Sequence, residues 1–453
     1  MAAPLTLGIF QLLGVNGTIG ASWRHPDNTS FRSLTLSHWT GLAKKFDEAG
    51  FDFLFFADGY GYPTLNGEVL DVAFRDAINV PLADPIPLLP ALAAVTERLG
   101  FVATASTTVE RPQALARRFA TLDHFTEGRV GWNIVTGASQ ASSARLFGEA
   151  MVPHDERYDR ADDYLALCLK LWEDSWDDDA LIVDKERGIF ADPAKVRQIE
   201  HNGPFFQAKG ILNVPPSPQR TPVLLQAGTS GRGRDYAARN AEAVFLAGGE
   251  ADHVAENIRD IRRRAVGYGR SPDSIKFLVG AMFVADETTA GAERKRNEML
   301  ALSTTEQAAA TFAFATGLDL LAMDQDAPLG GAKTEQGQSS VDRFQGENEA
   351  PRPTVRQILE DYRTNGINGS VFVGSGREVA DQIEQFAEQT GADGYLIQPH
   401  LTPGTYDDII EVVLPELRQR GLIDEAPAGS TLREHLFGVG KSRLPADYPR
   451  SAD

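Results

Sequence analysis

The sequence predicts an α/β fold, a (β/α)8 TIM barrel, from three observations. Short, nearly continuous apolar runs alternate with longer amphipathic segments along the 453 residues. Continuous apolar runs are typical of parallel strands that are covered on both faces. About eight such strand–helix cycles fit a closed barrel with long loop insertions. The stretch at 10–15 (FQLLGV), after the first strand, lacks the G-x-G-x-x-G pattern of a doubly wound open sheet, so the barrel is favoured.

Eight segments are predicted as barrel strands because they are apolar and several stop at turn residues such as Asp58-Gly59. In chain order they are Leu5–Phe10, Phe51–Ala57, Phe101–Ala105, Val130–Val135, Pro222–Gln226, Ala243–Ala247, Ile275–Val284 and Gly394–Pro399. In barrels of this class the working face lies at the carboxyl ends of the strands. The polar residues that follow these segments are therefore the first place to look for a site.

Helices are predicted between the strands from their amphipathic spacing, with glycines such as Gly50 at their ends. They are Leu36–Ala49, a helix near Leu88–Leu99, Pro112–Phe125, a helix near Ala141–Phe147, Arg157–Trp172, Gly231–Arg239, Ala251–Gly267, Thr288–Leu302, Glu378–Thr390 and Tyr406–Arg420.

Two stretches interrupt this alternation, at about 173–221 and 303–370. The first is irregular, with Trp and Asp clusters, and the second is rich in Gly, Gln, Asp and Ala. Residues 1–453 are therefore predicted to form a single barrel domain with two insertions. The second insertion is predicted to be a mobile lid, because long barrel loops without strong structure usually gate access.

Composition excludes several classes of protein. The formal net charge of −19 argues against binding to nucleic acid or to anionic membranes. No apolar run approaches the ~18 residues of a membrane span, and the N-terminus lacks the pattern of a signal peptide. The lone cysteine, Cys168, allows no disulfide within the chain, which fits a reducing compartment. A soluble cytoplasmic protein is expected.

A metal site and a serine nucleophile are both disfavoured. No two of the eight histidines are spaced i, i+4, and no carboxylate cluster has ligand spacing, so no metal is predicted. The sequence Gly374-Ser375-Gly376 is not a nucleophile elbow.

Two stretches combine into a predicted phosphate site. His154–Tyr158 (HDERY) and the glycine-rich turn Gln226–Gly233 (QAGTSGRG) each lie where a strand or turn gives way to a helix. Helix N-termini bind anions through unpaired N–H groups, and glycines let the backbone approach closely. His154 and Tyr158 could instead cap their helix, and Asp58 could be a turn aspartate.

The sequence resembles a known family over nearly its whole length. It is similar to the flavin-dependent monooxygenases of the bacterial luciferase superfamily, in the branch of the long-chain alkane, nitrilotriacetate and dibenzothiophene sulfone monooxygenases. The matching motifs are WRHP at 23–26, FLFFAD at 53–58, RRFATLDH at 117–124, GRVGWNIVT at 128–136, HDERYD at 154–159, SPQRTP at 217–222, QAGTS at 226–230 and PGTY at 403–406.

The resemblance implies a barrel that takes reduced FMN from a separate NAD(P)H:flavin reductase and reacts it with O2. A flavin C4a-hydroperoxide would then oxygenate a small-molecule substrate, while the protein supplies orientation and a dry pocket. It also implies a homodimer or homotetramer. The positions that it assigns to the flavin are Asp58, Thr104, Gly137, His154, Tyr158, Ala227, Gly228 and Ser230.

The sequence departs from the family at its histidines. Relatives carry them before the Trp-Arg-His motif, after the fourth strand and in the long insertion. This chain has GVNGTIG at 14–20, Thr136-Gly137-Ala138 and the segment TFAF at 311–314 in those places. No catalytic base is therefore transferred. Either the reaction needs little acid–base help, or Asn16 and Thr311 serve through hydrogen bonds.

Aromatic and aliphatic side chains are predicted to wall the substrate pocket. They are Phe10, Leu12, Phe56, Tyr60, Phe245, Phe312 and Phe372. Such a pocket favours an apolar xenobiotic-type substrate, either an aromatic or halogenated compound or one containing sulfur or nitrogen, over a polycarboxylate. The alternatives are a long-chain alkane hydroxylase, a deazaflavin-dependent oxidoreductase and an inactive flavin-binding protein.

Overall fold

Eight parallel strands close into a barrel in the computed structural model, which describes residues 4–15, 21–137, 140–344, 352–366 and 369–449. Each strand pairs with the next, and the last pairs with the first, Thr6 lying opposite Gly394. The barrel strands are β1 (Thr6–Leu12), β2 (Phe53–Ala57), β5 (Gly100–Ser106), β6 (Val130–Val135), β11 (Val223–Gln226), β12 (Ala243–Leu246), β13 (Lys276–Asp286) and β15 (Gly394–Gln398). The predicted barrel and its eight strand positions are confirmed.

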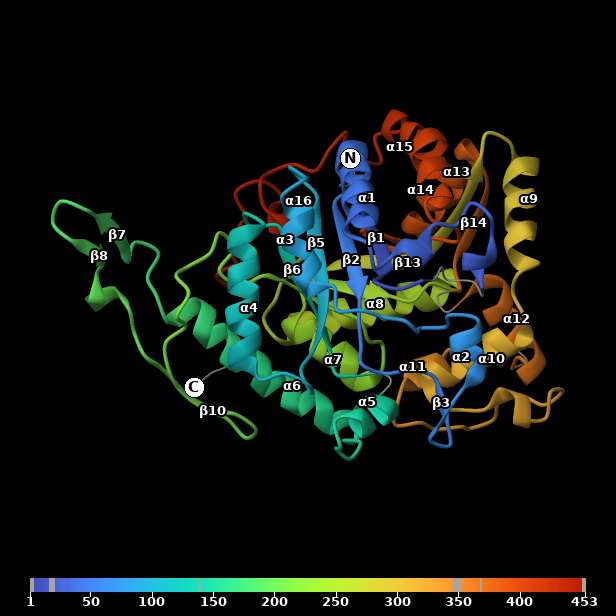
Figure 1. Cartoon of the computed structure of the whole chain (residues 1–453), viewed down its shortest axis with the longest axis horizontal. Coiled ribbons are helices and arrows are strands. Elements are labelled where there is room, and N and C mark those ends of the chain that lie inside the picture. The colour runs from blue at the N-terminus through green and yellow to red at the C-terminus, as the bar shows by residue number, and fades with distance from the viewer. Residues whose placement is uncertain (1–3, 16–20, 138–139, 345–351, 367–368, 450–453) are drawn as a thin grey trace.

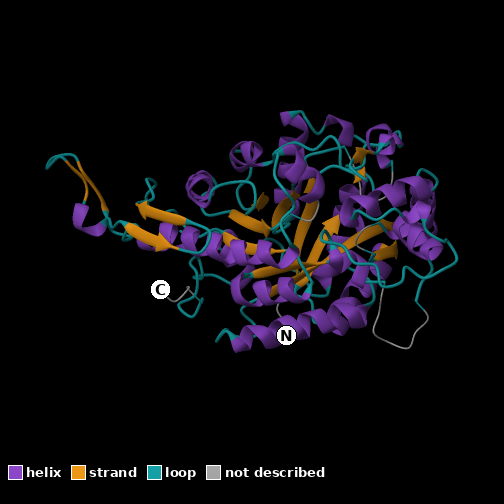
Figure 2. Ribbon diagram, turned by 90° about the horizontal axis from the view of Figure 1, so that it is seen from below, coloured by secondary structure: helices purple, strands orange, loops and turns teal. Residues whose placement is uncertain are grey.

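Helices surround the strands, as the view from below shows (Figure 2). Several were predicted to within a few residues. They are α1 (Leu36–Ala49), α3 (Leu89–Ala93), α4 (Pro112–Phe125), α5 (Gln140–Leu146), α6 (His154–Leu169), α7 (Gly231–Asn240), α8 (Ala251–Gly267), α9 (Thr289–Leu300), α13 (Gly376–Thr390), α14 (Gly404–Asp408) and α15 (Leu414–Gln419). A short helix, α2 (Asp71–Arg75), follows the β3–β4 hairpin (Thr64–Leu65 and Glu68–Val69).

Alternate residues of the strands face two different cores. Outward-facing side chains such as Phe56 and Trp132 pack under the helices. Inward-facing side chains such as Phe55 and Leu225 fill the barrel itself. Strand side chains alternate between faces, so consecutive aromatics such as Phe55 and Phe56 divide between the two cores.

The two ends of the barrel differ, and we call the amino ends of the strands the base and their carboxyl ends the mouth. Helix α16 (Leu432–Phe437) closes the base, where Leu432 and Leu436 join the inner core. In Figure 1, α16 lies near the N-terminus at the top, and α10 and α11 of the second insertion lie at the opposite end.

The first insertion, 173–221, forms two hairpins. They are β7 (Leu181–Asp184) with β8 (Ile189–Ala191), and β9 (Ile199–Asn202) with β10 (Gln207–Gly210). The β7–β8 hairpin stands away from the barrel in both views (Figures 1 and 2).

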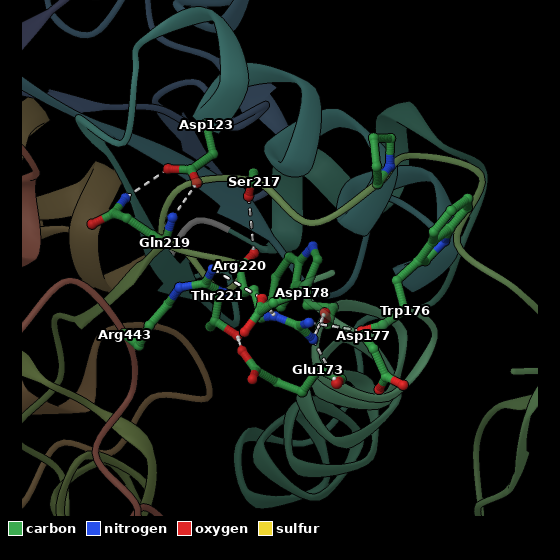
Figure 3. Close-up of polar contacts among 12 residues, drawn as sticks. Asp123, Glu173, Trp176, Asp177, Asp178, Ser217, Gln219, Arg220, Thr221 and Arg443 are labelled. Atoms are coloured by element: carbon green, nitrogen blue, oxygen red, sulfur yellow. Dashed lines mark hydrogen bonds and ion pairs between the residues drawn. The ribbon is translucent and has the colours of Figure 1, made fainter. Parts of the chain in front are cut away.

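A polar network at the base fastens this insertion (Figure 3). The guanidinium of Arg220 donates to the carbonyls of Glu173 (2.8 Å) and Trp176 (2.7 Å), and pairs with Asp178 (2.8 Å). Gln219 donates from its backbone to the buried Asp123 (2.8 Å). The SPQRTP motif therefore serves architecture here, because it ties the insertion to the strand that follows it.

The described part of the second insertion, 303–370, contains more helix than its composition predicted. It holds α10 (Thr305–Thr316), α11 (Gln338–Asp342) and α12 (Val355–Asn365), with a hydrophobic cluster of its own around Phe312 and Tyr362. Capping boxes begin α10 at Thr304 and α12 at Thr354. A further strand, β14 (Val371–Ser375), was not predicted. It lies outside the barrel and pairs in parallel with the second half of β13, from Met282 to Asp286.

Among the residues that the structure describes, no helix is long and apolar enough to cross a membrane.

Candidate functional site

A cavity of about 380 Å³ opens at the mouth of the barrel. Its walls come from the carboxyl ends of β1, β2, β5, β6 and β15, from the loops that follow them, and from α6 and α10. This is where the barrel rule places the working face.

One end of the cavity lies between the N-termini of two helices. His154 is the first residue of α6, and Ser230 is the N-cap of α7, where its hydroxyl accepts from the N–H of Gly233 (3.1 Å). The His154 Nε2 atom lies 3.4 Å from the Ser230 hydroxyl. Two converging helix N-termini with a hydroxyl and an imidazole form a cradle suited to a phosphate.

Tyr158 sets the shape of this cradle from one turn further along α6. Its hydroxyl is hydrogen-bonded to Ser230 and Thr136, and burial raises its pKa. A Cβ atom on Gly228 would lie 2.8 Å from that hydroxyl, and one on Gly233 would lie 2.9 Å away. Gly228 and Gly233 are therefore required as glycines, because the backbone passes so close to Tyr158 at these two positions.

Thr104 lines the cavity and is hydrogen-bonded to Asn133, which does not itself line it. The Thr104 hydroxyl donates to the carbonyl of Phe56 (2.8 Å) and accepts from the Asn133 amide (2.9 Å). That order leaves the Asn133 Oδ1 atom without a partner among the described residues. The amide nitrogen of Gln398 on β15 is likewise buried and unpaired within the described chain. Buried polar atoms of this kind normally find a ligand or water.

Three carboxylates also line the cavity. They are Asp58, Asp84 and Glu110. Burial, together with the nearby charge of Asp84, raises the pKa of Asp58 to about 6, despite the hydrogen bond that Asp58 accepts from the N–H of Gly59 (2.8 Å). Asp58 can therefore exchange a proton near neutral pH.

A segment of the second insertion lies at the end of the cavity that is formed by the N-termini of α6 and α7, which we call the phosphate end. Gln336, Gly337 and Gln338 line the cavity. Arg157, which is 1% exposed, donates to the carbonyls of Gly137 and Glu335 and so joins this segment to the loop after β6. Arg157 lies inside the HDERYD motif, three residues after His154, and its position there could have marked it as a site residue.

The structure brings the predicted flavin positions together. All eight line this one cavity, and they are Asp58, Thr104, Gly137, His154, Tyr158, Ala227, Gly228 and Ser230. Thr311 also lines it, with its hydroxyl donating to the carbonyl of Gln307 (2.9 Å). Asn16 lies outside the described residues.

The predicted apolar walls divide into two groups. Phe10, Leu12 and Tyr60 line the cavity. Phe245 does not line it but lies within the barrel, with its ring 5.9 Å from that of Phe10. Phe314 of α10, which was not predicted, does line it.

Three other predicted walls are wrong in placement. Phe56 faces outward and packs edge-on against Trp39 of α1, at 5.1 Å. Phe312 is enclosed in the core of the second insertion, 5.2 Å from Tyr362. Phe372 lies on β14, outside the barrel, stacked on Phe283. Each is apolar and close in sequence to the mouth, but its side chain faces a different core.

Known proteins resemble this chain over nearly its full length. A family model described as luciferase-like monooxygenase matches residues 16–394. The chain is 37% identical to the dimethyl-sulfide monooxygenase of Hyphomicrobium sulfonivorans, covering 99% of this chain and 93% of that protein. It is 38% identical to the long-chain alkane monooxygenase of Geobacillus thermodenitrificans, covering 99% and 97%.

A solved structure of a riboflavin lyase, with modified FMN and the substrate riboflavin, superposes with a TM-score of 0.94 at 42% identity, covering 99% of both chains.

Proposed function

The chain belongs to the luciferase-like monooxygenase family, and from this premise we propose that it is a two-component, FMN-dependent monooxygenase. The family resemblance and the enzyme class expected from the sequence are both confirmed. The cofactor, the reductase partner and the substrate class form the proposal.

The observation that carries this proposal is the convergence of eight predicted flavin positions on one cavity. His154, Tyr158 and Ser230 would bind the phosphate, between the N-termini of α6 and α7. Thr104 and Asp58 would contact the ring system. The glycine turn brings the N-terminus of α7 close to Tyr158, because a side chain at Gly228 or Gly233 would collide with that residue.

The protein's part in the reaction is to bind, orient and exclude water. A bound reduced flavin would supply the electrons that place one atom of O2 in the substrate and reduce the other to water. Asp58 lines the cavity, and burial raises its pKa to about 6, so it would be available to hold or release a proton there. Thr311 and the undescribed Asn16 remain candidates for hydrogen bonding.

The cavity favours a small, largely apolar substrate with some polar groups. Phe10, Leu12 and Phe314 provide apolar surface, while Asp58 and Glu110 would repel a polycarboxylate. The relatives named for dimethyl sulfide and for long-chain alkanes keep an apolar sulfur compound and an alkane as specific options.

A second candidate function is the cleavage of riboflavin. The likeness to the riboflavin lyase favours it, because that protein was solved with riboflavin as its substrate. Incubation with riboflavin, reduced FMN and O2, followed by chromatography of the products, separates this function from oxygenation of other compounds.

The proposal includes a separate NAD(P)H:flavin reductase, a cytoplasmic location and assembly as a homodimer or homotetramer. Because free reduced FMN reacts with O2 in solution, this protein has to bind the reduced flavin soon after the reductase releases it.

The test supplies reduced FMN through a flavin reductase, under ¹⁸O2, with a panel of dialkyl sulfides, aromatics and alkanes. One ¹⁸O atom in a product is expected. If all reducing equivalents appear as hydrogen peroxide, an inactive flavin-binding protein is favoured. If the protein binds a deazaflavin in preference to FMN, the proposal fails.

A further inference from the structure

An acidic side chain lies beside the cavity, at the N-terminus of α6. The carboxylate of Glu335 accepts a hydrogen bond from the backbone N–H of His154, at 3.1 Å. His154 is the first residue of the 16-residue helix α6, so this N–H is one of those that the helix itself leaves unpaired. Such a group at the positive end of a helix is what an anion seeks.

The backbone of Glu335 is fixed at the same place. Its carbonyl accepts from the guanidinium of Arg157, which also donates to the carbonyl of Gly137. The next three residues, 336–338, line the cavity. The carboxylate at α6 and the wall formed by 336–338 are therefore parts of one short segment.

The two arginines nearest this carboxylate already have partners, so they do little to offset its repulsion of an incoming anion. Arg232, which lies over the ring of Tyr158, is already paired with Asp159 (3.0 Å) and Asp162 (2.5 Å). Arg157 is held by two carbonyls and lies beside Glu335. Attraction for a phosphate at this end rests chiefly on the two helix N-termini, and Glu335 uses one of them.

We propose that Glu335 is an internal competitor of the flavin phosphate. Its carboxylate takes the N-terminus of α6 in the flavin-free protein, and a phosphate-bearing flavin has to displace it or accept its repulsion. Either way, Glu335 lowers the affinity for FMN relative to a flavin without phosphate. Displacement also moves 336–338, so phosphate binding reshapes the cavity wall contributed by the second insertion. The inference rests on the proposed flavin site.

This arrangement suits an enzyme that receives its flavin from another protein. A site that held FMN very tightly would retain the oxidised form and stop turnover. A built-in anion at the phosphate end weakens the bound state while leaving the ring contacts unchanged.

The test compares two probes that differ in the phosphate alone, oxidised FMN and riboflavin, titrated into the full-length protein by flavin fluorescence. The variants are Glu335→Gln and Glu335→Ala. The control is Asp326→Asn, which removes an equal charge from an exposed side chain of the same insertion that pairs with Arg356.

Both Glu335 variants are expected to bind FMN about 2- to 5-fold more tightly. This is the usual size of the effect of one charge at a helix terminus. Their riboflavin affinity should stay at the wild-type value, and the control should change neither. The alanine variant is included because a glutamine amide could itself donate to phosphate.

Hydrogen exchange supplies the second readout. FMN, but not riboflavin, should change the exchange of residues 333–338 in the wild type, and the alanine variant should lose most of this difference.

Unchanged or weaker FMN binding in both variants would overturn the inference while leaving the flavin site in place. An equal gain for riboflavin would also overturn it, because the effect would not act through the phosphate. If the wild type bound neither flavin, the proposed function would fail as well.

Discussion

The base and the mouth of the barrel each hold one of the two insertions, but by different kinds of contact. At the base, Arg220 has partners for its donors in three carbonyls and a carboxylate. Beside it, Arg433 and Glu242 form an ion pair at 2.7 Å with both side chains at most 3% exposed. At the mouth, the second insertion lines the cavity with residues 336–338, and the neighbouring carboxylate of Glu335 accepts a hydrogen bond from the N–H of His154 at the start of α6.

The difference teaches where function is located in this fold. At the base, the side chains of Arg220, Arg433 and Glu242 are hydrogen-bonded within the protein, which stabilises the fold and leaves these groups little capacity for a ligand. Polar groups at the mouth that lack partners among the described residues, such as Asn133 and Gln398, are costly until a ligand or water arrives. We therefore expect changes at the base to alter stability, and changes at the mouth to alter binding.

The largest effect is expected at the buried ion pair of the base. Arg433→Ala leaves the carboxylate of Glu242 buried and uncompensated, so the free energy of unfolding should fall by about 3–5 kcal/mol. Urea denaturation measures it. Arg443→Ala, which removes a half-exposed partner of Asp178, should cost at most about 1 kcal/mol. A loss at Arg433 no greater than that at Arg443 would break the comparison.

Two buried glutamines, one at the base of the barrel and one at its mouth, sharpen the comparison. Gln219 donates to Asp123 (2.7 Å) and to the carbonyl of Val130 (2.8 Å), so Gln219→Met should destabilise the protein by about 2–4 kcal/mol. Gln398→Met removes an amide nitrogen without a partner among the described residues, and should leave the stability of the flavin-free protein within about 1 kcal/mol. Similar losses in the two variants would contradict the distinction.

Two carboxyls give the comparison a pH dependence. At the base, backbone N–H groups of Ser430, Gly440 and Thr431 lower the pKa of Glu434 to about 2. Its folded pKa lies below its unfolded value, so it contributes stability above about pH 4 that is lost as the pH falls toward 2. At the mouth, the pKa of Asp58 is raised to about 6, so its ionisation lowers stability progressively from about pH 4 to pH 6.

Denaturation across pH therefore separates the two carboxyls. Glu434→Gln should cost about 1–2 kcal/mol at pH 7 and little near pH 2. Asp58→Asn should gain stability relative to the wild type between about pH 4 and pH 6, and keep that gain above it. A parallel shift of both variants at every pH would mean that the carboxyls titrate normally.

A smaller effect is expected on flavin affinity. Tyr158→Phe and Ser230→Ala should each weaken FMN binding by about 1 kcal/mol, because in the proposed site each would remove a hydrogen bond to the phosphate. The matched control is Tyr448→Phe, which loses a hydrogen bond to the carbonyl of Asn240 (2.6 Å) outside the cavity lining. If FMN binds both site variants as it binds the wild type, the phosphate lies elsewhere.

Much of the barrel could be predicted from the sequence because its strands are buried on both faces. Phe51–Ala57 and Ile275–Val284, for instance, are apolar runs that few other structures would use, and both became barrel strands. The positions that the family resemblance assigns to the flavin sit in local motifs at strand and helix ends, where a sequence comparison can find them. His154, Tyr158 and Ser230 lie on one cavity, as the motifs implied.

The errors arose where the direction of a side chain depends on tertiary packing. Phe55 and Phe56 are neighbours, yet one faces the inner core and the other faces α1. Phe312 and Phe314 lie on the same helix, but Phe314 alone reaches the cavity. The contact between Glu335 and His154 joins residues 181 positions apart, so no local pattern reveals it.

The most direct test of the proposed function is stopped-flow absorbance of the protein mixed anaerobically with reduced FMN and then with oxygenated buffer. The proposal predicts a flavin species distinct from both reduced and oxidised FMN, which lasts for seconds and decays faster when a substrate is present. Direct return to oxidised FMN at the rate of free flavin, with or without the protein, would contradict it.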